Sequence, residues 1–330
     1  MIFSSASRLN RALLAAAVAS SLTLAACTPE ETGPATEAAV GLTVDAPRIT
    51  VDSIGEGDRE VIAYRDIQEE PDDPEARTMQ DVSVEVAEGF TQEVMRADAV
   101  DVAAPAGGDV DTLTLPLTGS TSPAAEADPE NEERPATRDV ELRVGQPSST
   151  NLEQTDDIRS AEGFLVGWRG EDNGEVSTVR LAAPVDATDA GRATVEQSLM
   201  KLLSLPVVFP EEAVGPGATW SVDSRVTGES TLLQTTTYTL VSHDGDTVEL
   251  DVEVQQRPAL GALEMEDGQS LSVLNANTTS QGTLTVDLTQ PLPVDGEVAY
   301  TTRVIYGGPD SDVRVVQDST TGLTFSPTAD

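Results

Sequence analysis

The stretch DTVELDVEVQQ, residues 246–256, alternates between apolar and acidic side chains. In an extended chain its valines and leucine fall on one face, and Glu249, Asp251 and Glu253 fall on the other. A second alternating run, TTTYTLVS (235–242), precedes it, and the two are joined by HDGD (243–246). Asp-Gly between two such runs is a strong hairpin signal. The sequence therefore predicts an antiparallel hairpin with one dry face and one wet face.

The same alternation recurs along most of the chain, which predicts many more half-buried strands. The run at 82–95 is either two strands or one strand with a bulge at Gly89. Two acidic, proline-bearing insertions, at 68–77 and 122–136, predict solvated loops. The further candidate strands are RITVDSI (48–54), EVIAYRD (60–66), VSVEVAEGFTQEVM (82–95), TLTLPL (112–117), DVELRVG (139–145), GFLVGWR (163–169), VSTVRLAA (176–183), TWSVDSRV (219–226), GTLTVDL (282–288), VAYTTRVIYG (298–307), DVRVVQD (312–318) and TGLTFS (321–326).

One segment, DAGRATVEQSLMKLLSLP (189–206), breaks the strand pattern and predicts an amphipathic helix near 189–205. Asp189 is the expected N-cap and Pro206 the expected stop. The apolar positions follow the helical spacing i, i+4, i+7 and i+8, and they are Val195, Leu199, Leu202 and Leu203.

Strands with a single apolar face must cover that face with a second sheet, by closure, or with a helix. We expect a mainly β protein in which residues 47–330 form a large curved antiparallel sheet, a half-barrel or open barrel. The amphipathic helix then packs in or on this sheet. The alternative is two β-sandwich domains, before and after Pro206.

The only cysteine, Cys27, directly follows a predicted export signal. Two arginines, an apolar run from Ala12 to Leu24 and two alanines precede it, which is the order of a signal peptide over residues 1–26. The apolar run is shorter than the roughly 20 residues that a membrane-spanning helix needs. Leu24-Ala25-Ala26-Cys27 resembles the lipobox of bacterial lipoproteins. The resemblance implies cleavage before Cys27 and a diacylglyceryl group on its sulfur; a plain secretory signal is the alternative.

Residues 27–46 are rich in Pro, Thr, Glu and Ala and predict a lipidated, disordered tether. Removal of residues 1–26 leaves 17 bases against 58 acids, a formal charge of −41. This charge argues against nucleic acid as a partner, because nucleic-acid binding requires a basic surface. We therefore expect an exported protein held at the extracytoplasmic face of a cell membrane or envelope by the lipid on Cys27.

The stretch LPVVFPEEAVGPGATWSV (205–222), together with GTLTVDLTQPLPVDG (282–296), resembles an uncharacterised family of secreted or lipid-anchored actinobacterial envelope proteins. The resemblance implies an envelope protein of unassigned activity and brings no catalytic residues. In VGPGATW (214–220), a positive φ at Gly215 or Gly217 and a buried Trp220 are expected.

The residue inventory argues against an enzyme. The single histidine, His243, lies in the predicted hairpin turn, and no nucleophile, P-loop, dinucleotide or zinc motif is present. The acidic turns at 171–175, 244–246 and 309–312 do not reproduce the EF-hand pattern. We expect no catalytic residues, no metal site and no cofactor.

Two functions compete. In the first, Val195, Leu199, Leu202 and Leu203 face an apolar cavity, and the protein binds or carries a lipid or similar apolar ligand. In the second, side chains fill the domain, and the protein is an extracytoplasmic scaffold or an interaction partner of another envelope protein. The sequence identifies neither the ligand nor the protein partner.

Overall fold

The computed structural model describes residues 33–68, 78–127, 134–226, 231–264, 270–308 and 311–328. The chain divides into two compact units, Met1–Gly33 and Pro34–Asp330. The signal peptide, Cys27 and the start of the tether lie outside the described residues, as do most of the loop at 68–77 and the middle of the loop at 122–136. The description below concerns the second unit. In the described residues, no helix is long and apolar enough to cross a membrane.

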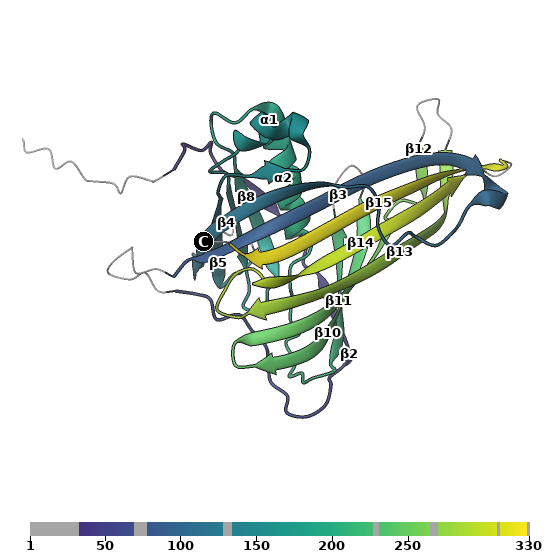
Figure 1. The fold of residues 1–330 in the computed structure, drawn as a ribbon. Helices are drawn as coiled ribbons and strands as arrows, with labels where there is room; N and C mark the ends of the chain where they lie inside the picture. Colours follow the sequence, from purple (N-terminus) through teal and green to yellow (C-terminus); the bar gives the residue numbers. More distant parts are fainter. Residues whose placement is uncertain are drawn as a thin grey trace, which may run out of the picture. The chain divides into compact units, whose positions relative to one another are not determined.

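The second unit is built on one antiparallel sheet (Figure 1). Its strands in the described residues are β1 (Val40–Thr43), β2 (Arg48–Ser53), β3 (Gln80–Arg96), β4 (Asp111–Pro123), β5 (Arg138–Val144), β6 (Ser148–Ser149), β7 (Leu165–Gly170), β8 (Val176–Ala182), β9 (Thr219–Val226), β10 (Leu232–Asp244), β11 (Thr247–Pro258), β12 (Ala262–Glu264), β13 (Ser270–Asp287), β14 (Asp295–Gly307) and β15 (Val313–Pro327). The helices are α1 (Thr155–Arg159) and α2 (Asp189–Leu203), with short 3₁₀ turns at Ala97–Ala99 and Leu152–Gln154.

The strand order is β1-β8-β7-β5-β4-β3-β15-β14-β13-β11-β10-β9-β2, with β12 beside β13 and β6 beside β4. The C-terminal strand β15 pairs with β3, so the two halves of the chain share one sheet. In the described part of the chain β1 and β2 lie at opposite ends of the order and do not pair, so the curved sheet stays open. The mainly β prediction is confirmed, and the two-sandwich alternative is wrong because strands from before and after Pro206 are neighbours.

The predicted hairpin is confirmed. β10 and β11 pair up to Asp244 and Thr247, and Gly245 takes a φ of 64° in the turn. The burial of β11 alternates along the strand, with its valines and leucine inside. β3 runs through Gly89 opposite Thr320 without a change of register, so neither a bulge nor a break forms there.

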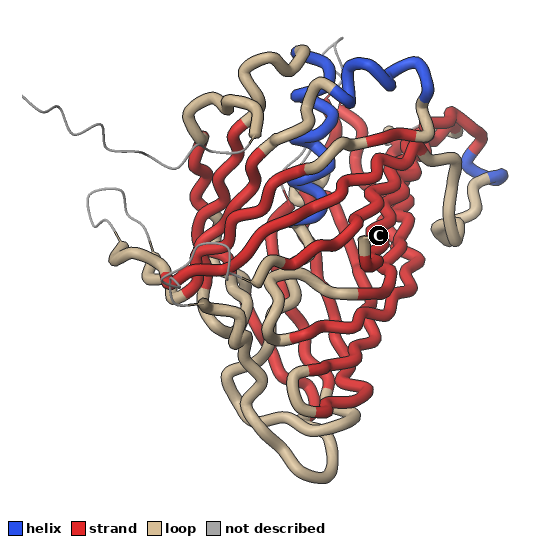
Figure 2. The backbone as a smooth tube through the Cα atoms, turned by 60° about the vertical axis from the view of Figure 1, so that its left-hand side comes forward, coloured by secondary structure: helices blue, strands red, loops and turns tan. Residues whose placement is uncertain are grey.

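Helix α2 covers the concave face of the sheet, as Figure 2 shows. Its N-cap is Thr188, whose hydroxyl accepts a hydrogen bond from the Gly191 amide at 3.1 Å. The prediction of Asp189 as the N-cap was therefore wrong by one residue, and Asp189 instead places an acid in the first turn, where the helix dipole favours it. The helix ends at Leu203, two residues before the predicted end.

The predicted strand at 60–66 is instead a strap, residues 60–68, that crosses between distant strands. It makes isolated bridges at Glu60 with Val214 and at Ile67 with Thr121. Between them the Tyr64 amide donates to the Asp172 carbonyl and the Arg65 amide to the Leu288 carbonyl. The alternation was real, because Ile62 and Tyr64 are buried. The backbone partners come from several loops rather than from one strand, which sequence alternation cannot distinguish.

The sheet splits between β11 and β13. Direct backbone pairing of these strands ends at Asp251 opposite Thr283. Beyond this point, the Val254 amide donates to Ser280 Oγ at 2.9 Å and the Gln256 amide donates to Thr278 Oγ1 at 2.9 Å. Side-chain hydroxyls thus replace backbone carbonyls as acceptors while the two strands diverge.

Candidate functional site

The four residues predicted to face a ligand lie together on the face of α2 that packs on the sheet. Val195 and Leu199 are 0% exposed and Leu202 is 4% exposed, within the single hydrophobic core. Leu203 is partly buried and packs against the same core. The helical spacing was therefore interpreted correctly, and Val195 and Leu199 contact packed core instead of open space.

A small interior cavity lies at the C-terminal end of α2. Leu202 and Leu203 line it, facing Tyr64 of the strap, Arg138 of β5 and Phe325 of β15. Its volume is about 40 Å³. Small-molecule sites typically occupy roughly 300–1,000 Å³, so in this conformation the interior cavity has room for a few water molecules only.

A buried ion pair lies beside the interior cavity. Arg138 donates from Nε to Asp66 Oδ1 at 2.8 Å and from Nη2 to Asp66 Oδ2 at 2.6 Å. Thr121 also donates to Asp66, at 2.5 Å. The guanidinium lies 4.0 Å from the ring centroid of Tyr64, a cation–π distance. These contacts fasten the strap to β4 and β5.

Aromatic side chains continue inward from the ion pair. Tyr64 contacts Phe209, Phe209 contacts Trp220, and Trp220 stacks on Tyr238 with ring centroids 5.6 Å apart. Trp220 and Tyr238 each donate at 2.8 Å to a carbonyl of the segment after α2. Burial raises the pKa of both Tyr64 and Tyr238, so neither is poised for proton transfer near neutral pH. Trp220 is buried as predicted, and Gly217 takes the positive φ, 77°.

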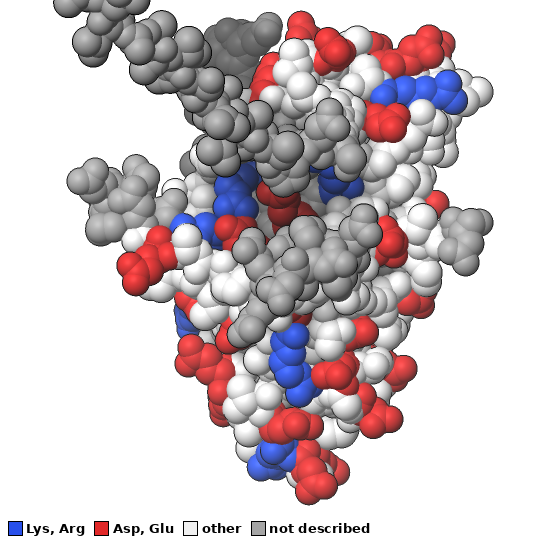
Figure 3. Space-filling model, turned by 90° about the vertical axis from the view of Figure 1, so that its left-hand side faces the viewer, with Lys and Arg blue, Asp and Glu red and all other residues white. Residues whose placement is uncertain are grey.

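A polar hollow lies on the other, outer face of the sheet. This outer-face hollow has a volume of about 510 Å³. It extends over β4, β5, β7 and β8, and the space-filling view of this side shows acidic groups in a hollow with basic groups on two sides (Figure 3). The side chains and backbone that line it are Met79, Thr118, Gly119, Ser120, Ser122, Asp139, Glu141, Leu142, Arg143, Leu165 and Arg180.

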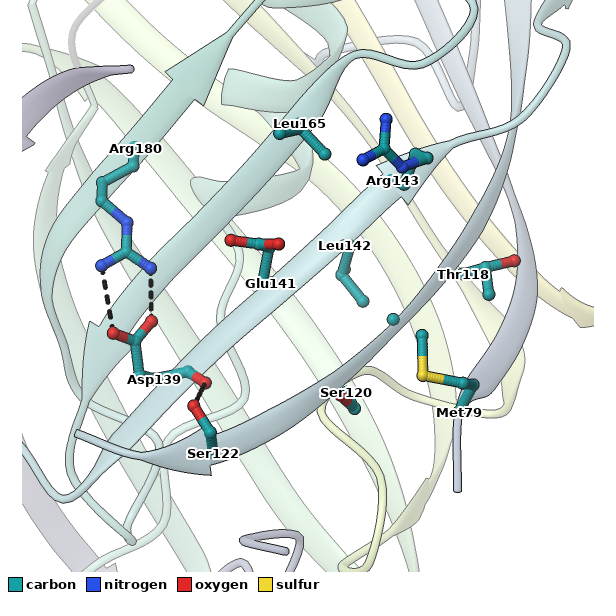
Figure 4. Close-up of a pocket in the computed structure, with 11 residues that line it drawn as sticks. Met79, Thr118, Ser120, Ser122, Asp139, Glu141, Leu142, Arg143, Leu165 and Arg180 are labelled. Atoms are coloured by element: carbon teal, nitrogen blue, oxygen red, sulfur yellow. Dashed lines mark hydrogen bonds and ion pairs between the residues drawn. The ribbon is translucent and has the colours of Figure 1, made fainter. Parts of the chain in front are cut away.

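Strand pairing aligns the charged groups of the hollow. Arg180 of β8 is opposite Gly167 of β7, and Gly167 is opposite Glu141 of β5. Arg180 crosses over Gly167 and binds Asp139 with two hydrogen bonds (Figure 4). A Cβ on Gly167 would lie 2.6 Å from the Val140 carbonyl oxygen, so the close approach of β5 to β7 requires glycine, and it would lie 3.2 Å from Nη2 of Arg180.

Glu141 is the exposed acid at the centre of the hollow. Figure 4 shows its carboxylate between the Arg180–Asp139 pair and Arg143. In the described residues Glu141 has no ion-pair or hydrogen-bond partner. Ser120 faces it from β4, where the two residues are opposite each other in the register. The hollow therefore offers an uncommitted acceptor in its middle.

The residues of this hollow were not predicted as a site from the sequence, although a signal was present. Asp139, Glu141 and Arg143 alternate along DVELRVG and were interpreted only as the wet face of a strand. The second glycine of GFLVGWR, Gly167, marks a close approach inside a strand. The sequence did not reveal which strands become neighbours, and that pairing alone brings Arg180 to Asp139.

The single histidine of the chain, His243, lies apart from the outer-face hollow. The side chain of His243 is 8% exposed, with Nδ1 3.1 Å from a Glu60 carboxylate oxygen and Nε2 3.0 Å from the Gly245 carbonyl oxygen. It is thus more buried than a turn residue was expected to be. No group of three or more His, Cys, Asp or Glu residues in the described ranges is arranged to hold a metal ion.

Comparison with known proteins gives one match. Residues 190–293 are similar to a family described as a family of unknown function, DUF6263. The matched segment starts in α2, runs through β9 to β13 and includes residues 205–222. No curated protein and no solved structure matches the chain. The similarity therefore covers the helix and the split part of the sheet, but not the strands that form the outer-face hollow.

Proposed function

We propose that this protein is a non-enzymatic, lipid-anchored protein of the cell envelope that acts as an interaction module with a filled core. The observation that carries the proposal is the packing of α2. Three of the four residues that would line a carrier's pocket, Val195, Leu199 and Leu202, are almost fully buried, and the adjacent interior cavity measures about 40 Å³. Function then depends on surfaces and on the lipid anchor proposed at Cys27.

An exposed apolar surface supports a protein partner. The four long strands β3, β13, β14 and β15 extend well past the rest of the sheet (Figure 1). On the outer half of β3 the side chains of Phe90 and Val94 are 58% and 68% exposed. They are four residues apart and so lie on the same face of the strand. Clusters of exposed apolar residues favour association with another protein.

The carrier function remains the second candidate, because Leu202 and Leu203 do line the interior cavity. Opening the strap would enlarge this space. The two functions differ in what copurifies with the protein.

Native mass spectrometry of the protein purified from its own host tests the choice. We expect no bound apolar species beyond the covalent lipid, and we expect crosslinking in intact cells to yield a defined protein partner. Phe90→Ser should reduce that crosslink, whereas Leu260→Ser, at another exposed apolar side chain (74% exposed), should leave it intact. Stoichiometric noncovalent lipid, lost in a Leu202→Trp variant, would establish the carrier function instead.

A further inference from the structure

We propose that the outer-face hollow binds a neutral, hydroxyl-rich ligand of the saccharide class. The site consists of the Glu141 carboxylate, the Arg180–Asp139 pair, Arg143 and the hydroxyls of Ser120 and Ser122. It is independent of the interior cavity and of the exposed apolar surface on β3.

The size of the hollow fits a small ligand. Its volume of about 510 Å³ falls inside the roughly 300–1,000 Å³ range of small-molecule sites. This range accommodates one or two sugar rings. The interior cavity, at about 40 Å³, accommodates none.

The charge of the hollow selects against ions. Among the described residues, the charged side chains that line it are two acids and two arginines, which balance within a chain of net charge −39. An anion would be repelled by the field of the whole protein as it approached. A cation attracted by that field would meet Arg143 and Arg180. A neutral ligand incurs neither repulsion.

The hydrogen-bonding groups match a polyol. A sugar hydroxyl both donates and accepts a hydrogen bond. Glu141 can accept from such a group, Arg143 can donate to it, and the hydroxyl of Ser120 can do either. The Asp139 and Arg180 side chains hold each other in place by two hydrogen bonds, so part of the site is ordered before a ligand arrives. Leu165 and Met79 add apolar contacts at its margin.

Isothermal titration of the full-length protein tests this inference. The protein is purified in a detergent without a sugar headgroup, and the probes are maltose, cellobiose and N,N′-diacetylchitobiose, with sodium phosphate and putrescine as charged comparators. We expect at least one disaccharide to bind with a millimolar or lower Kd, and we expect neither ion to compete with it. Phosphate or putrescine binding more tightly than every disaccharide would overturn the proposal, and so would the absence of disaccharide binding.

Two variants locate the binding. Glu141→Ala should weaken the Kd about tenfold or more, because it removes a charged acceptor. Ser120→Trp should block the hollow by bulk. Glu253→Ala, at an exposed acid on the outer face of β11, is the matched control and should leave the Kd unchanged. The thermal unfolding midpoint verifies that each variant is folded. Binding that survives both hollow variants would overturn the assignment.

Discussion

Arg138 and Asp66 form a two-bonded ion pair with 2% and 0% of their side chains exposed. Asp66 comes from the strap and Arg138 from β5, 72 residues later in the chain. Thr121 donates a hydrogen bond to Asp66, and the ring of Tyr64 lies against the guanidinium of Arg138. The pair therefore joins a segment without regular secondary structure to the middle of the sheet.

Asp66→Asn should destabilise the protein by about 3–5 kcal/mol, because it leaves the Arg138 charge buried without its counter-ion. Urea unfolding followed by tryptophan fluorescence measures the change. The control is Asp246→Asn, which breaks the exposed Arg65–Asp246 pair of the same strap and should cost at most about 1 kcal/mol. Equal effects of the two substitutions would show that the buried pair does not secure the strap.

The packing of α2 leads to a second prediction. Leu199→Ala should cost about 2–5 kcal/mol, since Leu199 is fully buried. Leu203→Ala should cost clearly less, because Leu203 is only partly buried and borders the interior cavity. Urea unfolding followed by tryptophan fluorescence measures the change in the free energy of unfolding for both variants. A mild effect of Leu199→Ala would indicate a loosely packed concave face and would favour the carrier function.

The alternation of side chains predicted most of the fold. Strands such as β11 and the helix α2 follow from local periodicity, because a period of two or of 3.6 directly determines which side chains share a face. The strap was assigned as a strand for the same reason. Its Ile62 and Tyr64 alternate with exposed positions, and only the long-range partners Val214 and Thr121 show that no ladder forms.

The outer-face hollow was not predictable in this way. Its residues come from 79, 118–122, 139–143, 165 and 180, and they are brought together only by the order β8-β7-β5-β4. Alternation identifies the outer face of each strand but not its neighbours. The packing of α2 was predictable, because its apolar side chains are buried against the apolar face of the sheet whatever the order of the strands.

The proposed lipidation depends on one sulfur atom, that of Cys27. Cys27→Ala should leave an unprocessed precursor or a protein released into the medium, because the proposed thioether bond cannot form without that sulfur. Immunoblots of membrane and medium fractions measure this. Cys27→Ser keeps the size of the side chain and should behave in the same way. A membrane-bound, correctly processed alanine variant would contradict the lipobox.

Stability should rise on mild acidification. Partial burial, Asp172 and Glu175 raise the pKa of Glu171 above its ordinary value of 4.5. The folded state then binds the proton more tightly than the unfolded state, so stability falls as the pH rises through this raised pKa. At neutral pH, Glu171→Gln should therefore stabilise by a small amount, within about 0.5 kcal/mol, and the gain should vanish below pH 4.5.

Melting temperatures across pH, with and without added salt, measure this effect. The net charge of −39 acts in the same direction, because acidification lowers the self-repulsion of the folded chain. Added salt screens the same repulsion and should also raise the melting temperature. Glu253→Gln controls for the loss of one charge elsewhere. A melting temperature that falls steadily on acidification from neutral pH, with no gain from salt, would exclude this account.

The split between β11 and β13 yields the last prediction. Ser280→Ala removes the acceptor of the Val254 amide, and Thr278→Val removes the acceptor of the Gln256 amide. Each backbone N–H then loses its partner in a partly buried place, which costs about 1–3 kcal/mol. Thr285→Val is the control. Its strand position is opposite Glu249, where the backbones pair directly, so it should stay within about 0.5 kcal/mol.

Hydrogen exchange distinguishes this local effect from general destabilisation. The amides of Val254 and Gln256 should exchange faster in the matching variant, while the amide of Leu250, inside the regular ladder, should keep its protection relative to global unfolding. Both strands are continuous on either side of the split, and the hydroxyls of Ser280 and Thr278 bridge them there. If both variants keep wild-type exchange at these amides, water can replace the hydroxyls, and the divergence of the strands is set by the core beneath them.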